Sequence, residues 1–158
     1  MKQLLAAALI LVSTQAQALS CLRPDPIRAF GVASAAEAEY LILRGTFAFD
    51  PALLPQNEVR TGLVLPQPIA AQFQGMSLTL DGFTNPIDGQ ITIMPVCIGA
   101  FCGGLQPDTE TIAFARRENA TYVVEADPCG GWLFVPDPVT EAALTACLRG
   151  EPCVPGLQ

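Results

Sequence analysis

The chain has 158 residues, with eight Lys and Arg against fifteen Asp and Glu, and it contains no His. Its only Lys is Lys2, so residues 19–158 hold seven Arg and fifteen acidic side chains, a net charge of −8. This part of the chain therefore cannot use Ser-His-Asp or Cys-His catalysis, His-ligated metals or a lysine Schiff base, and its acidic surface repels nucleic acid and anionic lipid head groups.

The N-terminal residues have the three parts of a secretory signal peptide. Lys2 supplies the positive charge, residues 4–12 form an apolar core, and Ala16-Gln17-Ala18 places small residues before a cleavage site after Ala18. The apolar run is shorter than the roughly 20 residues that span a bilayer, and Pro, Gly or charges interrupt every later run. We therefore predict a signal peptide over 1–18, no transmembrane segment, and one periplasmic or secreted domain over 19–158.

A lipoprotein signal is the alternative interpretation of the same residues, with Cys21 as the lipidated cysteine. In a lipoprotein signal a small residue is usual two positions before the cysteine, and a Leu is usual three positions before it. Here these positions hold Leu19 and Ala18, so the motif fits poorly. A lipid anchor in the envelope stays open as the alternative localisation.

The first half of the domain is expected to contain one helix and two strands. The Ala-rich stretch 27–39 predicts a short helix, and residues 40–49 predict a strand whose first half is apolar on both faces, as in a covered central strand. Residues 51–68 contain four prolines and no clear period, which is typical of a loop. Residues 69–80 predict a second strand, and the alternation of apolar residues slips at Gly75, which suggests a β-bulge there.

The second half continues with strands and ends in a helix. After a turn at Asp81-Gly82, residues 90–97 predict a third strand, whose end Pro95 places at an edge or bulge. Residues 111–117 and 121–127 predict a hairpin with a three-residue loop, and 131–135 a last short strand. Asp137 and Pro138 begin a helix that Gly150 ends. The sum is a mainly β domain: a small barrel of five or six antiparallel strands, with a helix near each end.

Several segments resemble netrin-like domains, the group that includes the tissue inhibitors of metalloproteinases and small exported bacterial proteins. The resemblance lies in Cys21-Leu22-Arg23-Pro24, the strand 40–47, Cys102-Gly103 before the strand 111–115, and the strand 122–126 that leads to Cys129. It implies an OB-type five-stranded barrel. The inhibitors bind a protease's zinc through an N-terminal cysteine, whereas Leu19 and Ser20 precede Cys21 here, so the resemblance does not extend to that mechanism.

The domain has six cysteines, an even number, which in an exported chain predicts three disulfides. They are Cys21, Cys97, Cys102, Cys129, Cys147 and Cys153, with no C-x-x-C pair for a zinc knuckle or a redox site. Glycines near these cysteines allow the chain to turn tightly, which favours the local pairs Cys97–Cys102 and Cys147–Cys153. Cys21 is then left to pair with Cys129. This remainder agrees with the resemblance, and the rival is Cys21 with Cys102 or Cys97.

Two residues are candidates for a binding surface. Phe101 lies in a loop between cysteines, and Trp132 follows two glycines. A Trp in that position more often covers a core beside a disulfide, and Arg116-Arg117 are more often solvated residues of a hairpin than an anion site. No cofactor or metal site is indicated.

The absence of a catalytic residue set favours a non-enzymatic binding module, whose partner is a protein or small molecule of the cell envelope. Two alternatives remain: a hydrolase that uses two carboxylates about 5 to 9 Å apart, and a structural envelope lipoprotein anchored at Cys21.

Overall fold

The computed structural model describes residues 20–56 and 66–156. The predicted signal peptide, residues 1–18, lies outside the described residues. The elements in chain order are α1 (Pro26–Ala35), β1 (Tyr40–Ala48), the 3-10 helix η1 (Pro51–Leu53), β2 (Ile69–Thr79), β3 (Gly82–Pro95), β4 (Cys97–Ile98), β5 (Phe101–Cys102), β6 (Thr111–Glu118), β7 (Thr121–Ala126), β8 (Leu133–Phe134) and α2 (Pro138–Leu148).

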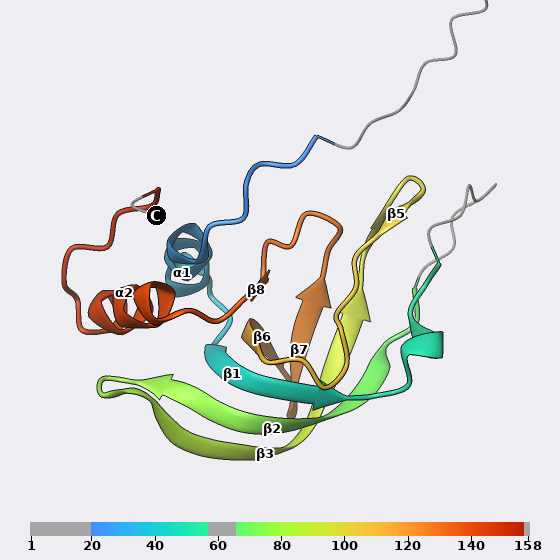
Figure 1. Ribbon diagram of the computed structural model, residues 1–158, viewed down its shortest axis with the longest axis horizontal. Helices are drawn as coiled ribbons and strands as arrows, with labels where there is room; N and C mark the ends of the chain where they lie inside the picture. Colours follow the sequence, from blue (N-terminus) through green and yellow to red (C-terminus); the bar gives the residue numbers. More distant parts are fainter. Residues whose placement is uncertain (1–19, 57–65, 157–158) are drawn as a thin grey trace, which may run out of the picture.

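Five strands close into a barrel (Figure 1). The sheet runs in the order β1-β2-β3-β7-β6-β8, and β6 also pairs with β1, which closes the ring. β8 adds only a short pairing to β6. The expectation that all strands are antiparallel is wrong, because β3 and β7 pair in parallel from Thr92↔Val123 to Pro95↔Ala126. The chain reaches that position by passing through β6 first, so β7 arrives beside β3 in the same direction.

The core has two parts, one inside the barrel and one between the barrel and the helices. Leu43, Phe47 and Phe73 are fully buried in the first part, and the Phe47 and Phe73 rings lie 4.9 Å apart. In the second part, Ile27 of α1 and Leu144 of α2 pack against Ile112 and Phe114. Strand β6 is therefore covered on both faces, which explains its unbroken apolar run. Burying each Phe side chain contributes about 1.5–3 kcal/mol.

Gly45 and Gly75 lie opposite each other in the antiparallel pairing of β1 with β2. A Cβ on Gly45 would lie 2.2 Å from the Gln74 carbonyl oxygen and 2.9 Å from Cζ of Phe73, and Gly75 is equally crowded. The two glycines thus let the backbones approach closely and leave room for the Phe73 ring. The bulge expected at Gly75 is not there: the register is continuous through this residue and shifts between Ser77 and Leu78.

Both helices begin at an Asp-Pro pair, and α1 is shorter than expected. Asp25 and Asp137 accept hydrogen bonds from the first backbone N–H groups of α1 and α2. The predicted helix 27–39 ends at Ala35, because Ala36 is already extended, with a ψ of 152°, and by Glu39 the chain lies beside β6, where the Glu39 carbonyl accepts the N–H of Arg117. Helix α2 ends as expected before Gly150, whose φ is 79°.

Three strand boundaries also differ from the sequence prediction. Strand β3 begins at Gly82, not at residue 90, and its polar first half pairs with β2 up to Gln90↔Gln72. The β6–β7 hairpin has the two-residue loop Asn119-Ala120, since Glu118 pairs with Thr121. Asn119 fits because its φ is 53°, a conformation that Asn tolerates better than most residues. The last strand, expected over 131–135, is limited to β8.

Candidate binding surfaces

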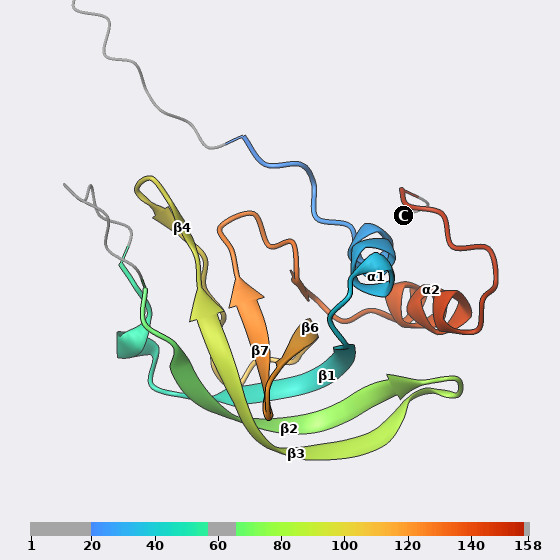
Figure 2. The same cartoon turned by 180° about the vertical axis from the view of Figure 1, so that it is seen from behind.

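A small hairpin rises from the barrel between β3 and β6. Its strands β4 and β5 pair through Cys97↔Cys102 and Ile98↔Phe101, and the first pair is also a disulfide. Gly99 has a φ of 61° at the first central position of the turn, where a tight hairpin of the II′ type needs glycine. Figures 1 and 2 both show this hairpin at the end of the barrel away from the two helices. We call residues 97–102 the stapled hairpin.

The base of the stapled hairpin is fixed to the barrel. The Val96 N–H donates to the Ala126 carbonyl at 2.9 Å, and the Gly103 N–H donates to the Val96 carbonyl at 2.8 Å. Gly103 lies so close to β7 that a Cβ would be 2.0 Å from the Ala126 oxygen. Leu105, just beyond, is buried in the barrel core. The hairpin therefore has both a covalent staple and an anchored stem.

The tip of the stapled hairpin exposes two large apolar side chains. Ile98 is 48% exposed and Phe101 is 41% exposed, and their cross-strand pairing places them side by side. The sequence analysis singled out Phe101 but missed Ile98. The signal that could have found it is the Cys97–Cys102 pair, because pairing these cysteines across a two-residue turn sets Ile98 opposite Phe101.

Trp132, the second candidate, packs mainly within the protein. Its ring stacks on Tyr40 with centroids 5.4 Å apart and lies 6.0 Å from the Phe114 ring. It adjoins the second core beneath the helices and follows Cys129 closely in the chain. This is the core-covering position that the sequence analysis favoured. Its remaining surface lines a cleft beside the N-terminal segment.

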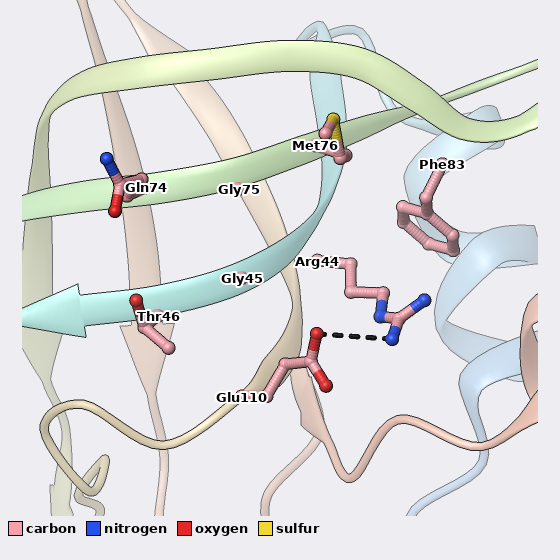
Figure 3. A pocket seen from close by; sticks show the side chains of 8 residues that line it. All are labelled: Arg44, Gly45, Thr46, Gln74, Gly75, Met76, Phe83 and Glu110. Atoms are coloured by element: carbon pink, nitrogen blue, oxygen red, sulfur yellow. Dashed lines mark ion pairs between the residues drawn. The ribbon is translucent and has the colours of Figure 1, made fainter.

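A third region of interest is a pocket of about 290 Å³ on the outer face of β1 and β2 (Figure 3). Arg44 reaches into it and pairs with Glu110 at 3.1 Å and with Glu141 of α2 at 2.9 Å. Figure 3 shows the Arg44 guanidinium turned toward Glu110. Two carboxylates thus converge here, as the hydrolase alternative requires, but both are engaged by one guanidinium. The Arg44 Nε is buried and donates to no acceptor among the described residues.

The two arginines of the β6–β7 hairpin are ion-paired. Arg116 contacts Glu118 and Glu125, and Arg117 contacts Glu39 at 2.8 Å. The hydrogen bond that Arg117 donates to Glu39, together with the Glu39 charge, raises the pKa of the exposed Arg117. These partners favour the structural interpretation of the pair over an anion site.

The three disulfides are Cys21–Cys129, Cys97–Cys102 and Cys147–Cys153, the pairs expected from the sequence. Within residues 20–56 and 66–156, no three His, Cys, Asp or Glu side chains gather as metal ligands, and no helix is long and apolar enough to cross a membrane. Comparisons with protein-family models, curated proteins and solved structures found no match to this chain.

Proposed function

We propose that this protein is an exported, non-enzymatic binding module on an OB-type barrel, which presents the stapled hairpin to a protein partner of the cell envelope. The ring β1-β2-β3-β7-β6, in which β3 and β7 form one parallel pair, supports the OB-type assignment. The observation that carries the proposal is the exposed pair Ile98 and Phe101 on the stapled hairpin, which is held by the Cys97–Cys102 disulfide and by backbone hydrogen bonds at its base.

The physical argument rests on pre-organisation. Ile98 and Phe101 differ from the other exposed apolar side chains because they pair across one hairpin and so form a small contiguous apolar surface, the kind of surface at which partners dock when it is extended. Because the staple and the anchored stem already hold the turn, binding would order little additional backbone. An aromatic side chain beside an aliphatic one is the kind of anchor that fills a pocket on a partner.

Export is supported by the cysteines. Three disulfides form and persist in oxidising compartments. The Cys21 sulfur is bonded to Cys129, and lipidation would need the same sulfur for a thioether. The disulfide therefore favours a free exported domain over the lipoprotein alternative.

The hydrolase alternative has less support. Its two carboxylates, Glu110 and Glu141, both contact Arg44, which is the arrangement of an ion-pair bridge between β1 and α2. A glycosidase instead needs one carboxyl that donates a proton and one that attacks or activates water.

A photo-crosslinking experiment tests the proposal. A benzophenone amino acid replaces Phe101 in one variant and Val135, which is 84% exposed and outside the hairpin, in a matched control. After irradiation in the native cell envelope, we expect a discrete protein adduct from position 101 and none from position 135. Adding Ile98→Ser to the first variant should weaken the adduct without changing the melting temperature. The same adducts from both positions, or none from position 101, would overturn the proposal.

A further inference from the structure

A cleft of about 330 Å³ lies beside the N-terminal segment, away from the stapled hairpin. It runs between residues 20–25, the exposed side of α1, and the chain around Cys129 and Trp132. The Cys21–Cys129 disulfide joins the wall formed by residues 20–25 to the wall around Cys129 and Trp132. Figure 1 shows the segment, in blue, leading into α1.

Two arginines on this cleft lack carboxylate partners. Arg44, Arg116, Arg117 and Arg149 each lie within 4.0 Å of a Glu oxygen. Arg23 and Arg28 make no such ion pair with the described residues, and both line the cleft. With Asp25 counted, the described side chains that line the cleft carry two positive charges and one negative charge, so in a chain whose overall charge is negative the cleft is a local site of opposite sign, which attracts anions.

The one carboxylate that lines the cleft is already satisfied. Asp25 accepts the N–H groups of Ile27 and Arg28 through Oδ1 and that of Gly156 through Oδ2. Burial raises the pKa of Asp25, but these backbone hydrogen bonds and the Arg28 charge outweigh it and hold the pKa below its usual range. Asp25 thus offsets one positive charge, while the guanidinium N–H groups of Arg23 and Arg28 remain available.

The rest of the cleft is apolar. Leu22 is 80% exposed and Val32 is 53% exposed, and Trp132 contributes the part of its ring that does not pack on Tyr40 and Phe114. A volume of about 330 Å³ falls at the lower end of small-molecule sites, which span roughly 300–1,000 Å³. Anion-binding groups beside an apolar wall suit a ligand with one charged end and one apolar end.

We propose that this cleft binds a small organic carboxylate with an apolar body, whose carboxylate Arg23 and Arg28 hold and whose apolar part lies against Leu22, Val32 and Trp132. This site is independent of the stapled hairpin and of the partner proposed for it. A planar guanidinium can hold a carboxylate through two parallel hydrogen bonds.

Trp132 is the only Trp of the chain, so its fluorescence reports on the cleft. The probe is octanoate, with octanamide as its uncharged counterpart, and each is titrated into the purified domain, residues 19–158. We expect a saturable change with octanoate and binding at least about tenfold weaker with octanamide, because the neutral amide cannot form the charge-assisted hydrogen bonds that a carboxylate forms with a guanidinium. Added salt should weaken octanoate binding.

Variants assign the effect to the two arginines. Arg23→Gln/Arg28→Gln should weaken octanoate binding about tenfold or more, with an unchanged far-UV circular dichroism spectrum. Arg117→Gln, an exposed arginine outside the cleft, and Ile98→Ser in the hairpin should leave it unchanged. Equal binding of octanoate and octanamide, or insensitivity to the double substitution, would overturn the proposal. A failed crosslink at position 101 would leave it standing.

Discussion

The Asp25 carboxylate joins two positions that are 131 residues apart: its Oδ1 caps the start of α1, and its Oδ2 accepts the backbone N–H of Gly156 at 2.8 Å. One side chain thus fixes both the helix that covers the second core and the segment beyond the Cys147–Cys153 disulfide. Asp137 caps α2 in the same way, but among the described residues it accepts only from Val139 and Thr140, in the first turn of its own helix. The two aspartates therefore form a natural matched pair.

We expect Asp25→Ala to release the C-terminal segment and Asp137→Ala not to. Each loses a helix cap, which costs about 1 kcal/mol, so the free energy of unfolding should fall by similar amounts in urea titrations. Amide hydrogen exchange separates them: the Gly156 N–H should exchange faster in Asp25→Ala and at the wild-type rate in Asp137→Ala. Unchanged exchange of Gly156 in both variants would contradict the bridge.

The same two caps should make stability depend on pH in acid. Hydrogen bonds from the Thr140 hydroxyl and N–H, with a smaller one from Val139, outweigh burial and hold the pKa of Asp137 below its usual range, and the pKa of Asp25 is also lowered. Because these folded-state values lie below the unfolded value of about 3.9, their contribution is present above that pH and is lost as the pH falls through the folded pKa values.

Asp25→Asn/Asp137→Asn tests this, because Asn caps helices nearly as well as Asp but does not titrate there. The wild type should be more stable than this variant at pH 7, and the difference should shrink as the pH falls below about 4. Urea unfolding at pH 7, 5 and 3.5 measures it. A difference that is constant with pH would show that the carboxylates titrate alike in both states.

The close approach of Gly45 and Gly75 predicts that substitutions at different strand glycines have very different effects on the free energy of unfolding. A Cβ at Gly45 or Gly75 would lie 2.2 Å from a backbone oxygen and 2.7 Å from the opposing Cα, whereas Gly89 of β3 has open space. Gly45→Ala should lower the free energy of unfolding by at least about 3 kcal/mol, at the upper end of overpacking costs. Gly89→Ala should change it by less than about 1 kcal/mol. If denaturant titrations showed similar losses of unfolding free energy for Gly45→Ala and Gly89→Ala, this close approach would be excluded.

The sequence predicts features that local chemistry determines. Residues 40–43 are all apolar, and this indicates that the first half of the strand is covered on both faces. Asp137-Pro138 specifies a helix start, since the carboxylate caps and Pro tolerates the first turn. The pairing of Cys97 with Cys102 follows from a glycine that allows a tight turn between them.

Features that depend on distant contacts could not be predicted. The first half of β3 carries Pro86 and polar residues, so it has no strand alternation, and only its pairing with β2 makes it a strand. The parallel alignment of β3 with β7 depends on how the ring closes. The cleft unites Arg28 with Trp132, which no spacing rule connects.

The Arg44 bridge predicts unequal effects of its two carboxylates. Glu141 is 23% exposed and Glu110 is 54% exposed, while Arg44 is 35% exposed. Because solvent screens exposed ion pairs, Glu141→Gln should cost about 1 kcal/mol and Glu110→Gln less than about 0.5 kcal/mol. Double-mutant cycles with Arg44→Gln in urea titrations measure each coupling. A larger coupling for Glu110 would contradict this ranking, and hydrolysis of chromogenic glycosides or esters that either variant abolishes would favour the hydrolase.

The disulfides should differ in stabilising effect according to the loops they close. Cys21–Cys129 spans 108 positions, and Cys97–Cys102 spans five. In the chain-entropy model the long loop is worth roughly 5 kcal/mol and the short one roughly 2 kcal/mol. Cys21→Ser/Cys129→Ser should therefore destabilise the domain most, and it should also detach the wall of the cleft that carries Leu22 and Arg23. Removing both partners together avoids a free thiol that could form a new pair.

Cys97→Ser/Cys102→Ser is the matched control, because it removes a disulfide from the stapled hairpin and leaves the cleft walls joined. Its unfolding free energy should fall less, and its Trp132 fluorescence should stay that of the wild type. In Cys21→Ser/Cys129→Ser, the Trp132 emission should shift to longer wavelength as water reaches the ring beside the released segment. Equal losses of stability, or an unchanged Trp132 emission in both variants, would show that the N-terminal segment stays in place through Asp25 and its α1 contacts without the disulfide.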